Sequence, residues 1–71
     1  MEQVREEVFE ALGRGEAVAI PTSDYGRNDP ILVCDDEGNE IEATVVAVSV
    51  VSGKDHAVVA KGRIDNDDNT N

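Results

Sequence analysis

The stretch from Ile41 to Val51 constrains the fold most, because it is long, almost uncharged and rich in β-branched residues. Its apolar residues occupy odd positions at first and even positions later: Ile41, Ala43, Val45 and Ala47, then Val46, Val48 and Val50. Successive side chains of a strand point to opposite faces, so the apolar character changes face midway. A β-bulge, or a strand buried on both faces, would produce this change. Such a long, bent strand is typical of a small barrel or a strongly curled sheet.

The N-terminal segment, residues 2–12, has the pattern of a helix. Its apolar residues recur at spacings of three and four, which places them on one face: Val4, Val8, Ala11 and Leu12. Gly13 and Gly15 follow, and we expect them to end the helix.

Three further apolar runs are predicted to be strands: Ala17–Ile20, Ile31–Cys34 and His56–Ile64. Turn-forming residues at 36–39 and 52–55 separate the last three of the four strands. Short turns join antiparallel neighbours, so these three strands are predicted to form an antiparallel meander.

The chain has 71 residues, which is enough for one small domain. We predict an α+β fold over residues 1–64, with the N-terminal helix packed on a curved four-stranded antiparallel sheet. This sheet could close further into an SH3-like or OB-like partial barrel. Residues 65–71 contain no apolar side chain and are predicted to be a disordered acidic tail.

The composition is strongly acidic, with 16 Asp and Glu against 6 Lys and Arg and a formal net charge of -10. Only two of the cations are Lys, and eleven Val and seven Ala dominate the apolar set. This usage resembles that of cytoplasmic proteins from halophilic archaea that accumulate salt. The resemblance implies a chain that works at molar salt, where charges are screened within about 3 Å. Under that condition the net charge would not exclude nucleic acid as a partner.

Targeting signals and disulfides are not evident. No apolar run approaches the roughly 20 residues that a membrane span needs. The N-terminus is acidic and amphipathic, whereas a signal peptide begins with basic residues. The single cysteine, Cys34, precludes a disulfide within the chain. We therefore expect a cytoplasmic protein with no membrane partner.

The sequence offers little for catalysis. His56 is the only histidine, and Cys34 is the only thiol; the two could approach each other across the sheet, but Cys34 is better explained as a small apolar residue. There is no Cys/His cluster for zinc and no glycine-rich phosphate loop. The acidic segment 35–40 does not match a calcium loop and is interpreted as a hairpin turn. We expect no enzymatic activity, cofactor or metal.

Two features favour binding. The loop between Pro21 and Pro30 carries Tyr25 and Arg27, residue types enriched at binding hot spots. Lys61 and Arg63 share a face of the last predicted strand and could form a small basic stripe. The first hypothesis is a module that binds a protein partner or a second copy of itself. The alternative is association with nucleic acid or the ribosome. An ordinary connecting loop remains the simpler interpretation of these residues.

Overall fold

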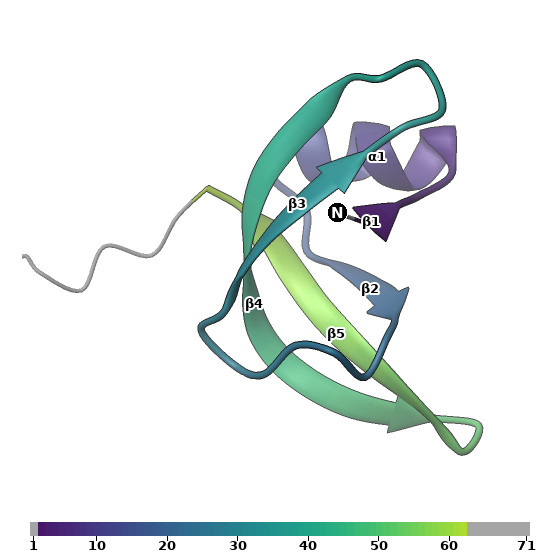
Figure 1. Ribbon diagram of the computed structural model, residues 1–71, viewed down its shortest axis with the longest axis vertical. Coiled ribbons are helices and arrows are strands. Elements are labelled where there is room, and N and C mark those ends of the chain that lie inside the picture. The colour runs from purple at the N-terminus through teal and green to yellow at the C-terminus, as the bar shows by residue number, and fades with distance from the viewer. Residues whose placement is uncertain (1, 63–71) are drawn as a thin grey trace, which may run out of the picture.

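The computed structural model describes residues 2–62 (Figure 1). It contains one helix, α1 (Glu6–Gly13), and five strands. The strands are β1 (Glu2–Gln3), β2 (Val18–Pro21), β3 (Pro30–Cys34), β4 (Glu40–Val51) and β5 (Lys54–Lys61). Arg63 and the expected tail, residues 65–71, lie outside the described residues.

The five strands form one sheet in the order β1-β3-β4-β5-β2. The antiparallel meander is confirmed, because β3 pairs with β4 and β4 with β5 in antiparallel register. Strand β2 returns to pair antiparallel with β5 at the far edge. Figure 1 shows that the sheet curls around its own inner face into a half-barrel, with α1 at one end.

The prediction of a helix over residues 2–12 on a four-stranded antiparallel sheet was wrong at the N-terminus. Glu2 and Gln3 pair in parallel with β3, and the Val4 N–H donates to the Cys34 carbonyl at 2.9 Å. Arg5 is still extended, with φ -71° and ψ 157°, so the helix begins only at Glu6. The sheet is therefore mixed and has five strands. Pairing with the open edge of β3 satisfies backbone groups there, and this outweighs a weak helical preference.

The change of face within β4 is caused by a β-bulge. Val45 lies opposite Val59, but Ala47 lies opposite Val58, so Val46 is the extra residue. Residues paired across antiparallel strands share a face, and Val48 therefore lies on the inner face, opposite the buried Ala57. The bulge keeps apolar residues on the inner face along the whole strand and adds to its bend.

The core lies between the inner face of the sheet and α1. Its buried members come from the helix and from four strands: Leu12, Ile20, Ile31, Val33, Ala43, Val45, Ala57 and Val59. Phe9 and Tyr25 are half-buried against this cluster. Lys61 fixes the end of the helix, because its Nζ donates to the Gly13 carbonyl at 3.0 Å. A cation at this position also suits the negative end of the helix dipole.

Candidate functional site

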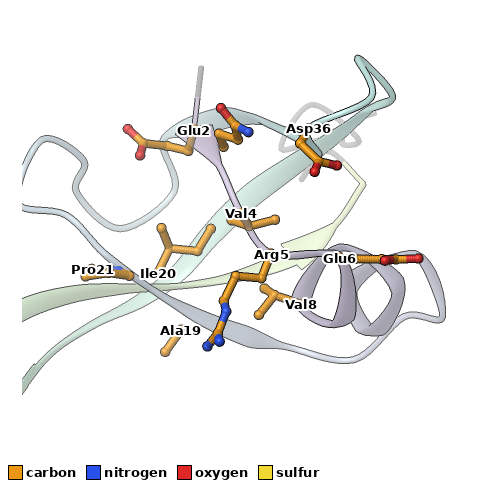
Figure 2. A pocket seen from close by; sticks show the side chains of 10 residues that line it. Glu2, Val4, Arg5, Glu6, Val8, Ala19, Ile20, Pro21 and Asp36 are labelled. Atoms are coloured by element: carbon orange, nitrogen blue, oxygen red, sulfur yellow. The ribbon is translucent and has the colours of Figure 1, made fainter.

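Because the half-barrel is open, its two edge strands, β1 and β2, border a groove (Figure 2). The groove has a volume of about 550 Å³. Figure 2 shows the apolar side chains of Val4, Val8 and Ile20 below the acidic side chains of Glu2 and Asp36, with the Arg5 side chain beside Val8. The groove therefore combines apolar side chains with both acidic and basic ones. No group of His, Cys, Asp and Glu residues suited to a metal ion occurs within residues 2–62.

Acidic side chains gather where α1 approaches the β3–β4 turn. Glu6 lies near Glu10 on the same helix and near Glu37 and Asp36 of the turn, and its pKa is raised. The charge of Glu10 is the main cause, followed by some loss of hydration and then by the charges of Glu37 and Asp36. A raised carboxyl pKa means that ionised Glu6 opposes folding, an effect that disappears as the pH falls through the raised pKa.

The β3–β4 turn is built around one carboxylate. Asp35 accepts hydrogen bonds from the backbone N–H groups of Glu37 and Asn39 and from the Asn39 side-chain amide, each at 2.9 Å. Gly38 completes the turn with φ 89°, a conformation that favours glycine. The bond from the Asn39 side chain is the main cause of the lowered pKa of Asp35, and the two backbone bonds add to it. Partial burial acts in the opposite direction but is outweighed.

Replacing Asp35 by alanine is expected to lower the urea midpoint of unfolding, because three N–H donors lose their acceptor. The lowered pKa means that Asp35 stabilises the fold above its ordinary pKa of 3.8, and that this contribution is lost as the pH falls through the folded-state pKa. Urea titrations between about pH 7 and pH 2.5 should therefore show the two proteins converging at the acidic end. Asp36→Ala is the matched control, since it removes a neighbouring carboxylate whose charge raises the pKa of Glu6. Equal midpoints for Asp35→Ala and wild type at neutral pH would contradict this account.

The loop that carries Tyr25 and Arg27 is tied to the sheet at both ends. At its start, the Thr22 N–H donates to the Asp55 carbonyl at 3.2 Å. At its end, the Asn28 N–H donates to the Val45 carbonyl at 2.7 Å, and the Val45 N–H donates to the Asp29 carbonyl at 3.0 Å. These backbone bonds give the loop a defined position against β4 and β5.

Tyr25 and the distal part of β4 share a second, shallower groove. Its volume is about 370 Å³, and Tyr25, Val48 and Val50 are among the residues that line it. Val48 is 57% exposed and Val50 is 66% exposed, whereas Val46 and Val51 are less than half exposed. We call Tyr25, Val48 and Val50 the tyrosine–valine surface. Sequence reasoning did not identify the valines as surface residues, although residues 43–53 are the longest uncharged run in the chain.

The predicted site residues do not all come together. Tyr25 and Arg27 share the loop, and the exposed Arg27 side chain has no hydrogen bond or ion pair with the rest of residues 2–62. Lys61 lies opposite Ala43 and is bonded to the helix end. Five residues of β4, about 16 Å at strand spacing, separate that position from Val48. Arg63 is outside the described part of the chain, so the stripe of Lys61 and Arg63 stays a prediction, while Lys61 itself lies away from Tyr25.

The structure also separates Cys34 from His56. Cys34 lies half-buried on β3 opposite Glu40, near the β3–β4 turn. His56 lies on β5 opposite Ser49, towards the other end of β4, with its Nδ1 3.0 Å from the Lys54 carbonyl. The sheet therefore holds the thiol and the imidazole apart, which removes the one nucleophile–base pair that the sequence suggested.

These features define a small α+β half-barrel with an apolar surface beside an anchored loop. No known protein family, curated protein or solved structure matches the chain. Within residues 2–62, α1 is the only helix, and its eight residues are too few to cross a membrane.

Proposed function

We propose that this chain is a non-catalytic module that binds another protein through the tyrosine–valine surface. The exposure of Val48 and Val50 beside Tyr25 is the observation that carries this proposal. Exposed apolar side chains gain most from being covered by a partner, and tyrosine adds a large, amphipathic contact area. The backbone bonds that anchor the loop limit the entropy lost on binding.

The surroundings of this surface favour protein over nucleic acid. Binding to single strands needs a basic groove and aromatic platforms for the bases. Phe9 packs against the core, and Tyr25 is half-buried there as well. Lys61 is hydrogen-bonded to the end of α1. Arg27 is the one basic residue between Pro21 and Pro30. We therefore favour a protein partner, with nucleic acid as an outcome that the test below distinguishes.

We further propose that the module works in the cytoplasm of a halophilic archaeon. The support is compositional: a net charge of -10, two lysines and a large share of valine and alanine. In such salt, charged surfaces are screened and the hydrophobic contribution to binding dominates. An apolar surface within an acidic chain suits those conditions.

Affinity capture from cell extract in molar KCl, with and without nuclease, would test the proposal. Tyr25→Ala should weaken the captured protein complex by on the order of 2 kcal/mol, with little dependence on salt. Tyr25→Phe retains the ring and should bind nearly as wild type. Circular dichroism of both variants would confirm that the fold is retained.

A nuclease-sensitive complex would contradict protein binding. In that case Arg27→Ala should flatten the salt dependence of affinity by roughly one unit of slope for one phosphate contact. If a captured complex is unchanged by alanine at both Tyr25 and Arg27, the loop is only a connector and the proposed site is wrong.

A further inference from the structure

One edge of β4 is open beyond the bulge. Strand β3 pairs with β4 only from Glu40 to Thr44. Backbone hydrogen bonds of Val45 with Asn28 and Asp29 of the loop extend this pairing by one residue. From Ala47 to Val51, β4 pairs with β5 on one side and with no other strand in the described part of the chain. Figure 1 shows this part of the β4–β5 hairpin extending away from α1.

The hairpin geometry directs two residues towards this edge. Ser52 and Gly53, with φ 53° and 78°, form a two-residue turn between the paired residues Val51 and Lys54. In such hairpins the pair next to the turn exchanges both hydrogen bonds, and bonded pairs then alternate along the ladder. The N–H and C=O groups of Val48 and Val50 therefore point away from β5, towards the open edge.

The strand residues at this edge carry none of the usual protection against pairing, and the loop of Thr22 to Gly26 lies beside them across a groove. Natural sheets protect exposed edges with charged side chains, proline or a covering element. Residues 43–53 contain no charge and no proline, in a chain in which 31% of residues are charged. The side chains of Val48 and Val50 are also more than half exposed on the inner face. An open, uncharged valine strand is the arrangement expected at an interface.

We infer that a second copy of this chain pairs with this edge, in antiparallel register about a two-fold axis at Ser49. This inference rests on the proposed function and names the partner. The register pairs Val48 with Val50 of the second copy, so the outward N–H and C=O groups of both meet. The inner-face valines of the two copies then lie side by side, and two five-stranded sheets become continuous.

The charge distribution favours a second copy at this place. Strand β4 runs from Glu40, beside the β3–β4 turn, to Val51 at the hairpin tip. The acidic cluster of Glu6, Glu10 and the turn therefore lies beside the Glu40 end of β4, whereas the open edge lies towards the Val51 end. Two copies that meet through the edge keep these clusters apart, and the acids nearest the edge are Asp55, opposite Val50, and Asp29, bonded to Val45.

The interface is small. Five paired residues and their valines bury on the order of 500 Å² per copy, compared with about 800 Å² in a standard specific interface. We therefore expect a dissociation constant in the micromolar range, strengthened in molar salt, where the acidic chains repel each other less.

Sedimentation equilibrium of the full chain in about 2 M KCl should show a reversible monomer–dimer equilibrium. Val50→Lys should weaken it at least tenfold, because the substitution places two lysines beside the partner strand. Ala17→Lys makes the same change of charge at an exposed position outside the strands and should dimerise as wild type. A wild-type chain that remains monomeric to about 1 mM, or a Val50→Lys dimer as stable as the control, would overturn the inference.

Cross-linking tests the register independently. In a Cys34→Ala background, Ser49→Cys should oxidise to a disulfide-linked dimer, because non-bonded antiparallel pairs have Cα atoms about 4.5 Å apart, which a disulfide can span. Ser52→Cys in the same background would lie about 20 Å from its counterpart and should remain unlinked. Equal linkage of the two variants would overturn the register.

The outcomes also separate this inference from the proposed function. A monomeric chain that captures a different protein through Tyr25 would refute the dimer and leave the protein-binding function intact. A dimer linked through Ser49, with no other protein captured, would support the dimer and refute a different partner.

Discussion

Replacing Leu12 by alanine is expected to unfold much of the protein in dilute buffer. Leu12 is 0% exposed and is the helix residue fully buried in the core. Removing a buried leucine side chain costs about 2–5 kcal/mol, through lost burial and the cavity left behind. A chain of 71 residues is stabilised by only about 4–10 kcal/mol. The loss is therefore a large part of the total.

Urea denaturation followed by circular dichroism would measure this loss. Leu32→Ala is the matched control, since Leu32 is the only other leucine and lies half-buried on the outer face of β3. The control should cost less than about 1.5 kcal/mol, because less surface is lost from contact with the protein. Equal losses for the two variants would mean that α1 does not pack on the sheet as described.

Raising KCl from about 0.1 M to about 2 M is expected to increase the urea midpoint by on the order of 1 M. The salt shortens the screening length from about 10 Å to about 2 Å. This relieves the repulsion within a chain of charge -10 and among Glu6, Glu10 and the acids of the β3–β4 turn. Some salts also strengthen the burial of apolar surface, so the effect of charge repulsion on stability needs a separate measurement.

Glu6→Gln supplies that measure. It removes one carboxylate from the cluster, so it should raise the midpoint at low salt and leave a smaller difference between the two salt levels. Equal or lower stability of the wild type at high salt would count against adaptation to salt. An unchanged salt dependence in Glu6→Gln would instead place the repulsion elsewhere on the surface.

Local sequence signals predicted much of the fold. The face change along 41–51 indicated either a bulge or a strand buried on both faces, of which the bulge is present, and the turn signals correctly indicated that β3, β4 and β5 form an antiparallel meander. Both depend on interactions between residues close in the chain, which periodicity and turn composition describe well. The exposed loop with Tyr25 and Arg27 was also recognisable as a connection between two strands.

Only the tertiary structure decided the remaining features. Residues 2 and 3 became a strand because the β3 edge, about 30 residues away in sequence, offered them backbone partners. Lys61 was bound by the helix end, 48 residues earlier in the chain, a contact that no local pattern predicts. Val48 and Val50 became surface residues because the core ends before the hairpin does. Composition and periodicity determined which residues could be buried, but long-range packing determined which of them were covered and which edge stayed open.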